Sequence, residues 1–356
     1  MISATPIFFW YKKAERLDGL PYLNAKSTAM DPEDRSEAPL LPSIAEIEAA
    51  RERVRGAAIR TPLVRLNTTD APAEIYLKLE NLQPIGSFKI RGAASAMGRL
   101  GKDELAQGVL TASAGNMAQG VAWCARRLGI PATVVAPETA PATKIAAIER
   151  LGGRVIPVPF ETWWETFENR RFADALGRFI HAFDDPDVMA GNGTIGLEIL
   201  EDLPDVDAVV VPWGGGGLLC GIAAAIRARR PDCRIFAAEV ETAAPLGPSL
   251  AAGVPTSVDY RPSFVDGIGG KGVFPRMLER VRGVVDGALA ASLEDIAAAV
   301  RLLAERNRVV AEGAGACPVA IALSGRAGAG KIVCVVSGGN IDLDRFCGVI
   351  RGVGLR

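Results

Sequence analysis

One lysine of this chain is set among apolar neighbours, where its amine could act as a nucleophile. Lys89 follows a predicted strand, a Pro/Gly turn and Phe88, and it precedes Ile90 and Ala93. A lysine on an ordinary helix is a solvated charge. Because apolar residues flank this one, we expect desolvation to lower the pKa of its amine, as a Schiff-base lysine requires.

A run of four consecutive glycines lies between a predicted strand at 209–211 and a predicted helix: Gly214, Gly215, Gly216 and Gly217. Such a loop lets the backbone approach an anion, and the start of the following helix adds N–H groups and partial positive charge. The run therefore predicts a phosphate site. The alternative is a tight turn, but turns of that kind use one or two glycines.

Two further segments place polar side chains where predicted strands end. Ser113 and Asn116 follow the apolar run 108–112, and Ser337 follows the run 331–336. With Ser113 as an N-cap, its hydroxyl, the free N–H groups and the Asn116 amide could bind a carboxylate. The neutral Ser337 hydroxyl could face a heterocyclic nitrogen without protonating it, although a turn after a buried strand explains this residue equally well.

Two nucleotide-binding patterns fail at these glycine-rich loops. No register of residues 214–221 gives Gly-x-Gly-x-x-Gly, so a dinucleotide site is disfavoured. Residues 325–331 fit Gly-x-x-x-x-Gly-Lys, but Ile332 stands where a P-loop needs Ser or Thr, and a strand follows instead of a helix. We interpret this segment as a helix-to-strand loop, with a nucleotide-binding ATPase as a competing hypothesis.

The composition excludes several kinds of site. His181 is the single histidine among 356 residues, so histidine triads and multi-histidine zinc sites are excluded. Lys+Arg total 40 and Asp+Glu 41, and this balance provides no field that would concentrate nucleic acid or an anionic membrane. The six cysteines form no CxxC pair, and we interpret them as buried, reduced thiols of a cytoplasmic protein.

The periodicity predicts an α/β fold. A capping box, Ser43 with Glu46, opens a helix that we expect to reach about residue 58, and residues 1–42 are interpreted as a loosely ordered extension. No apolar run is long enough to span a membrane. Strands are predicted at 75–80, 108–112, 132–136, 154–158, 208–212, 234–238 and 331–336, with helices at 116–128, 141–151, 161–179, 216–229 and 293–306. Alternation of this kind indicates parallel sheets flanked by helices.

Taken together, these motifs resemble the fold-type-II pyridoxal-phosphate enzymes, in particular the serine/threonine dehydratase (ammonia-lyase) family, which also contains serine racemase. The resemblance covers about residues 43–342. It implies pyridoxal 5'-phosphate as cofactor, held by Lys89 as Schiff-base lysine and general base. It further implies that Phe88 packs on the pyridine ring, Asn116 contacts the 3-oxygen and Ser337 faces the ring nitrogen. It implies that the phosphate is bound by Gly214, Gly215, Gly216, Gly217 and the Leu218 amide. It implies that the substrate carboxylate is bound by Ser113, Ala114, Gly115, Asn116 and Met117.

The chain departs from the family pattern at several positions. Ala114 stands where racemases of the group carry a second serine as acid/base, and Met117 stands where a histidine is usual. Glu239 matches one residue of the family's cation site, but Pro245 stands where an acidic ligand is common, so no bound metal is expected. Glu312 matches an acidic residue near the pyridine side. Trp163 and Trp164 are interpreted as core or interdomain packing rather than substrate contacts.

The resemblance implies β-elimination from an L-β-hydroxy amino acid such as L-threonine or L-serine, giving a 2-oxo acid and ammonia. The alternatives are a dehydratase for a bulkier or acidic 3-hydroxy amino acid, a serine racemase, and a non-catalytic cofactor-binding homologue. The resemblance also implies a homodimer. We expect a large domain built from residues 43–94 and 186–356, with a small domain inserted at 95–185, and with the cofactor between them.

Overall fold

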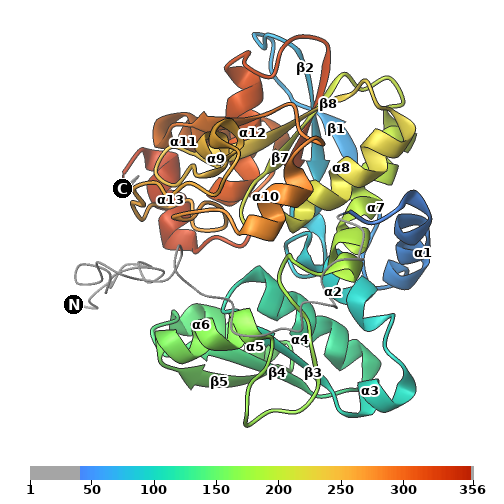
Figure 1. Ribbon diagram of the computed structural model, residues 1–356. Helices are drawn as coiled ribbons and strands as arrows, with labels where there is room; N and C mark the ends of the chain where they lie inside the picture. Colours follow the sequence, from blue (N-terminus) through green and yellow to red (C-terminus); the bar gives the residue numbers. More distant parts are fainter. Residues whose placement is uncertain (1–40, 354–356) are drawn as a thin grey trace.

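The computed structural model describes residues 41–353, in which two β-sheets are each covered by helices (Figure 1). The six-stranded sheet has the order β1 (Leu63–Arg65), β2 (Glu74–Leu79), β10 (Lys331–Val336), β7 (Ala208–Pro212), β8 (Arg234–Val240) and β9 (Gly287–Ala291). The four-stranded sheet has the order β5 (Arg154–Val158), β4 (Ala132–Pro137), β3 (Val109–Ala112) and β6 (Arg178–Phe179). The predicted α/β class with parallel and mixed sheets is confirmed.

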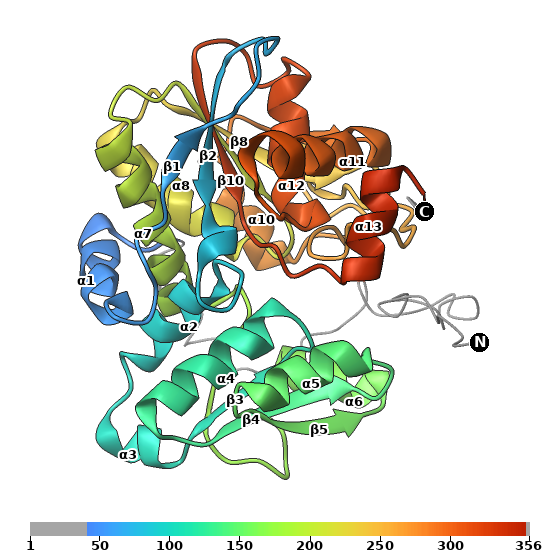
Figure 2. The same cartoon turned by 180° about the vertical axis from the view of Figure 1, so that it is seen from behind.

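The helices follow the strands along the chain and pack on both sheets. In Figures 1 and 2, α3 to α6 lie with the four-stranded sheet, and α7 to α13 lie with the six-stranded sheet. Their bounds are α1 Ile44–Val54, α2 Lys89–Met97, α3 Lys102–Ala106, α4 Asn116–Leu128, α5 Ala142–Arg150, α6 Phe160–Asn169, α7 Pro186–Asp202, α8 Gly217–Arg229, α9 Leu246–Ala252, α10 Pro275–Val281, α11 Leu293–Leu302, α12 Gly313–Leu323 and α13 Leu343–Arg351.

The central strands of the large sheet are apolar on both faces, because helices cover both. Along β7, Val210 belongs to one core cluster, whereas Val209 and Val211 belong to the other. All neighbouring strands of this sheet are parallel except the pair β1 and β2. Near-continuous Val, Ile and Ala runs are typical of such doubly covered parallel strands.

Helices α2, α7 and α8 pack closely together behind the site. A Cβ on Gly221 of α8 would overlap the Met189 carbonyl of α7, and a Cβ on Gly92 of α2 would lie 2.7 Å from Val188 Cγ1. Small residues therefore let α2 and α8 each pack closely on α7.

Most predicted elements are confirmed, with two errors of length. The helix predicted to reach residue 58 ends at Val54. The helix predicted at 161–179 ends at Asn169, because Arg170 takes the left-handed conformation (φ 56°), and a loop then leads to β6. The prediction missed β1, β9 and α7, among others. The division into an inserted domain, 95–185, and a large domain stays a prediction.

The structure also bears on the predictions for the N-terminal extension, for membrane-spanning helices and for the cysteines. The extension predicted for residues 1–42 lies almost wholly outside the described residues. No helix between residues 41 and 353 is long and apolar enough to cross a membrane. All six cysteines are unpaired, but Cys347 is exposed on α13, so the expectation that all six are buried is wrong for this residue.

The P-loop-like segment 325–331 joins α12 to β10. Its prediction as a helix-to-strand loop is confirmed. Its lysine, Lys331, pairs with the Asp205 carboxylate, and its backbone N–H donates to Asp207 Oδ2 at 2.7 Å. Both groups that a P-loop would use to bind phosphate, the lysine and a loop N–H, therefore interact with carboxylates. The negative charge of these carboxylates repels phosphate.

Candidate active site

A cavity of about 490 Å³ lies where strands of both sheets end. Its walls include residues that follow β3, β4, β7 and β10 in the chain. Open α/β sheets bind ligands beyond the carboxyl ends of their strands, and this cavity has the size of a small-molecule site. Among the residues that line it are Phe88, Lys89, Ser113, Ala114, Gly115, Asn116, Met117, Gly214, Gly215, Gly216, Gly217, Leu218, Glu312 and Ser337. The structure thus brings together every residue that the sequence assigns to the cofactor or substrate.

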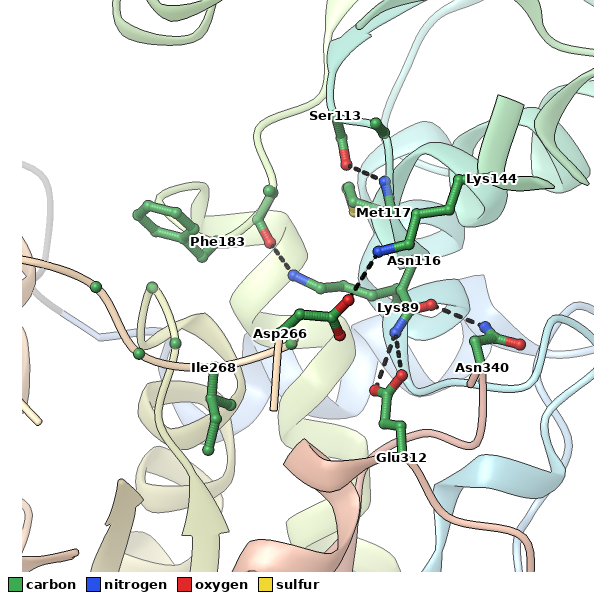
Figure 3. Close-up of a pocket in the computed structure, with 18 of the residues that line it drawn as sticks. Lys89, Ser113, Asn116, Met117, Lys144, Phe183, Asp266, Ile268, Glu312 and Asn340 are labelled. Carbon is green, nitrogen blue, oxygen red and sulfur yellow. Dashed lines mark hydrogen bonds and ion pairs between the residues drawn. The ribbon is translucent and has the colours of Figure 1, made fainter. Parts of the chain in front are cut away.

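Lys89 is the first residue of α2, and its side chain reaches into the cavity (Figure 3). The Lys89 Nζ atom donates a hydrogen bond of 2.7 Å to the Ala182 carbonyl and lies 5.1 Å from the centre of the Phe88 ring. Burial lowers the pKa of this amine from its usual 10.5 to about 8, while the Glu312 carboxyl opposes the shift. A neutral amine is therefore accessible near physiological pH.

A buried ion network fixes α2 two residues beyond Lys89. The Arg91 guanidinium is 1% exposed and binds the Glu80 carboxylate at 2.8 Å and the Glu198 carboxylate at 2.7 Å. Glu198 also accepts a hydrogen bond of 2.6 Å from the buried Lys78 amine. Each charge is paired and hydrogen-bonded, which is the condition under which buried ions are tolerated. The network ties α2 to β2 and α7.

The glycine loop connects β7 to α8 and passes over Phe183. A Cβ on Gly215 would overlap the Phe183 ring, and one on Gly217 would lie 2.5 Å from the Phe183 carbonyl oxygen. Gly216 has φ 93°, a conformation that favours glycine. The loop therefore needs glycine at these positions, and it presents backbone N–H groups at the start of α8, which suits a phosphate.

Residues 113–117 form the turn from β3 into α4. The helix begins at Asn116 with Gly115 as its N-cap, so the prediction of Ser113 as N-cap is wrong. Ser113 lies two residues earlier, where its hydroxyl accepts a hydrogen bond of 3.2 Å from the Gly115 N–H. The N-terminus of α4 opens on the cavity and can bind an anion.

Asn116 is held between two other polar side chains (Figure 3). Its Nδ2 atom donates to Glu312 Oε1 at 3.1 Å, and its Oδ1 atom accepts from Asn340 Nδ2 at 2.8 Å. Asn340 Nδ2 also donates to the Ile85 carbonyl at 2.8 Å. Burial, followed by repulsion from Asp266, raises the pKa of the Glu312 carboxyl to about 8. These contacts orient the Asn116 amide toward the cavity.

Ser337 follows β10 and contacts the segment that leads into α2. The Phe88 N–H donates to the Ser337 carbonyl at 3.0 Å, and Ser87 forms an antiparallel bridge with Gly338. The Ser337 residue is 3% exposed and lines the cavity. Strand β10 and the segment before helix α2 are thereby joined at the cavity edge, where Ser337 is among the lining residues.

The residues present fit pyridoxal phosphate. The cavity contains a buried amine for the aldehyde, a glycine cradle for the phosphate, an aromatic ring beside the amine and a neutral serine. The roles assigned to single residues from the family resemblance stay predictions.

Glu239, in contrast, offers little to a cation. Its carboxylate accepts hydrogen bonds from the Leu246 and Gly247 N–H groups at 2.8 and 3.0 Å, and burial raises its pKa to about 7. Within residues 41–353 no three potential metal ligands of the His, Cys, Asp and Glu types lie together. The expectation of no bound metal stays a prediction.

Sequence reasoning missed the segment 181–183 and the ion pair between Lys144 and Asp266. Ala182 gives its carbonyl to Lys89, and its neighbour His181 is buried, with Nδ1 accepting the Asp184 N–H at 2.8 Å. Lys144 Nζ lies 3.1 Å from Asp266 Oδ2 and joins α5 to the loop before α10. A backbone carbonyl has no sequence signal, and these pairs are far apart in the chain.

A family model described as "Pyridoxal-phosphate dependent enzyme" matches residues 54–338. The L-threonine ammonia-lyase of Thermotoga maritima is 42% identical over 314 residues, which cover 87% of this chain and 78% of that protein.

Solved structures share the architecture. A serine racemase of maize superposes with a TM-score of 0.79 at 32% identity, covering 87% of this chain and 97% of that one. The processed form of threonine deaminase isoform 2 from Solanum lycopersicum superposes with a TM-score of 0.77 at 31% identity, covering 88% of this chain and 88% of that one.

Proposed function

Because the chain belongs to the family of pyridoxal-phosphate-dependent enzymes, we propose that it eliminates the β-hydroxyl group of an L-β-hydroxy amino acid, of which L-threonine and L-serine are the simplest. The products are a 2-oxo acid and ammonia. The observation that carries the proposal is the Lys89 amine, which lies in one cavity with the glycine loop 214–217 and the α4 N-terminus at 113–117. Relatives named L-threonine ammonia-lyase support the same reaction.

The cofactor is assigned to residues of both sheets. The N–H groups of 214–218 would hold its phosphate, Lys89 would bind its aldehyde, Ser337 would face the ring nitrogen and Asn116 would contact the 3-oxygen. Pyridoxal phosphate supplies an electron sink that acidifies the Cα–H bond of a bound amino acid.

The chain's own groups then carry out two tasks. The N-terminal amides of α4 and the Ser113 hydroxyl bind and orient the substrate carboxylate. The Lys89 Nζ atom, when neutral, removes the Cα proton, and its pKa of about 8 suits a general base near physiological pH. Loss of the β-hydroxyl as water and subsequent hydrolysis of the enamine give the 2-oxo acid and ammonia.

Racemisation is the weaker candidate, although a maize serine racemase has a similar structure. A second base must deliver a proton to the opposite side of Cα, and the family's racemases use a serine there. Ala114 lines the cavity at that position and has no transferable proton. We therefore assign elimination rather than racemisation.

The proposal extends to assembly and location. We infer a homodimer, a cytoplasmic location and a two-domain arrangement with residues 95–185 inserted, all from the family resemblance. Light scattering after size-exclusion chromatography checks the dimer, since a particle of twice the chain mass of 37.4 kDa is expected. A particle of 37.4 kDa would contradict it.

The function is tested with purified protein loaded with pyridoxal phosphate. L-serine, L-threonine, aryl-substituted and acidic 3-hydroxy amino acids are each supplied, and 2-oxo acid and ammonia are both measured. Equal amounts of the two products from at least one substrate are expected. A protein that binds the cofactor but yields neither product from any of them would be a non-catalytic homologue, and a protein that binds ATP but no pyridoxal phosphate would contradict the family chemistry as well.

A further inference from the structure

Four half-buried aromatic rings line one side of the cavity, and we call them the aromatic wall: Phe160, Trp164, Phe183 and Phe274. Trp164 and Phe274 stack with their ring centres 6.1 Å apart and an interplanar angle of 22°. The ring centres of Phe183 and Phe274 are 5.4 Å apart, with an interplanar angle of 51°. Each of the four residues is half-buried and lines the cavity, so the wall contributes apolar ring atoms to it.

Residues from distant parts of the chain build this surface. Phe160 and Trp164 belong to α6, which packs on the four-stranded sheet, whereas Phe274 precedes α10 beside the six-stranded sheet. Trp163 is different, because it is 2% exposed and belongs to the core cluster with Phe167. Trp163 and Trp164 both line the cavity, but Trp163 is almost wholly buried in the core, which fits the interpretation as packing, whereas Trp164 is half-buried.

One residue of the wall, Phe183, directly follows the residue that accepts a hydrogen bond from the Lys89 amine. Lys89 Nζ donates to the Ala182 carbonyl, and Ala182 is followed directly by Phe183 (Figure 3). In the proposed binding mode, with the carboxylate at 113–117 and Cα beside Lys89 Nζ, the substrate would direct its Cβ substituent toward the wall. A substituent on Cβ therefore meets aromatic rings.

The charges in the cavity disfavour an acidic substituent there. Lys144 is already neutralised by Asp266, whose Oδ2 atom lies 3.1 Å from its Nζ atom. Arg150 is exposed at the end of α5. A second substrate carboxylate would have to compete with Asp266 for Lys144, at a cost in desolvation.

We propose that the aromatic wall selects L-3-hydroxy amino acids that carry an aryl or another large apolar group on Cβ, with Trp164 as the specificity-determining residue. This inference rests on the proposed elimination and narrows its substrate class. For a phenyl group, the Cα–H and Cβ–O bonds break, water leaves, and hydrolysis of the enamine gives phenylpyruvate and ammonia. Neither oxidant nor reductant is needed.

The test compares kcat/KM for L-threo-phenylserine, L-threonine and L-serine with the cofactor-loaded protein. Contact of a phenyl group with the wall is expected to raise kcat/KM for phenylserine about ten-fold or more above that for L-threonine. Equal or lower kcat/KM for phenylserine would overturn the inference. If none of the three yields a 2-oxo acid, the proposed function itself fails, so the two failures are distinguishable.

Two alanine variants test whether the preference for phenylserine comes from the aromatic wall. Trp164→Ala is expected to lower kcat/KM for phenylserine about ten-fold while changing that for L-threonine about two-fold at most. Trp123→Ala is the matched control, because Trp123 is a half-buried indole on α4 that packs on Arg127 away from the cavity. Equal losses for both substrates in Trp164→Ala, or the same selective loss in Trp123→Ala, would contradict the assignment.

A binding measurement gives a readout without turnover. L-Phenylalanine and L-alanine lack the β-hydroxyl and cannot eliminate water, so each is titrated into the cofactor-loaded protein by calorimetry. L-Phenylalanine is expected to bind about ten-fold more tightly than L-alanine, and Trp164→Ala is expected to remove most of this difference. Equal affinities in the unmodified protein would overturn the inference.

Discussion

The Lys89 Nζ atom donates a hydrogen bond of 2.7 Å to the backbone carbonyl of Ala182. This contact joins the first residue of α2 to the segment that follows β6, about 90 residues later in the chain. A carbonyl accepts from the amine in either protonation state, so it positions Nζ without fixing its charge. Burial then sets the charge by lowering the pKa to about 8.

We predict that capture of pyridoxal phosphate by the apoprotein accelerates as pH rises from 7 through about 8, because the neutral amine is the nucleophile. At pH 7.5 a pKa of about 8 leaves roughly a quarter of the amine neutral, against about one part in a thousand at its usual value. Stopped-flow absorbance measures the rate. Free lysine in the same buffer is the control, and a protein rate that follows the control's steeper rise toward pH 10 would contradict the lowered pKa.

The cavity residues that lie in short motifs could be predicted from the sequence. Lys89, the glycine loop 214–217 and Ser337 each follow a strand with a recognisable apolar pattern. Parallel strands direct their carboxyl ends to one edge of a sheet, so motifs at strand ends converge. Their convergence on one cavity follows from this topology.

The partners of these residues could not be predicted. Ala182 contributes only a carbonyl, and Phe274 meets Trp164 across more than 100 residues of chain, which periodicity cannot reveal. The overlong helix at 161–179 has a similar cause. Arg170 ends it in a left-handed conformation that is not typical of arginine, so no glycine or proline marks the end.

We predict that Gly215→Ala weakens pyridoxal-phosphate binding at least ten-fold, because the new Cβ would overlap the Phe183 ring and displace the loop. Gly214→Ala is the matched control in the same loop, since its Cβ would come no nearer than 3.4 Å to the described atoms around it. Fluorescence titration of the apoproteins gives both values of Kd. Equal effects of the two substitutions would show that the contact with Phe183 does not shape the loop.

We predict that Asn340→Ala lowers kcat about ten-fold, because Asn116 loses the 2.8 Å hydrogen bond that orients its amide. Asn307→Ala removes two comparable hydrogen bonds outside the cavity, to Arg65 and Asn67. Each substitution is expected to lower the free energy of unfolding by about 1–2 kcal/mol, measured by urea denaturation. Only Asn340→Ala should change kcat, and an equal loss in Asn307→Ala would refute a positioning role for Asn340.

We predict that the difference in stability between the unmodified protein and a Glu239→Gln variant depends on pH. The pKa of Glu239 is raised from about 4.5 to about 7 by burial, so the folded protein binds one more proton than the unfolded chain between these values. The contribution of this group to stability therefore falls as pH rises from about 4.5 to 7, by up to about 3 kcal/mol. Glu239→Gln cannot ionise, so its Tm relative to the unmodified protein should rise between pH 5 and pH 8. Parallel pH profiles of the two proteins would contradict the raised pKa.

The most direct test of the account is the turnover of Lys89→Ala beside the unmodified protein. Both are loaded with pyridoxal phosphate and supplied with L-threonine and L-threo-phenylserine, and 2-oxo acid is measured after circular dichroism has shown that both are folded. We expect 2-oxo acid from the unmodified protein and a loss of about 10³-fold or more in Lys89→Ala, since the general base and the cofactor attachment are removed together. Comparable 2-oxo acid production by a folded Lys89→Ala protein would contradict the account.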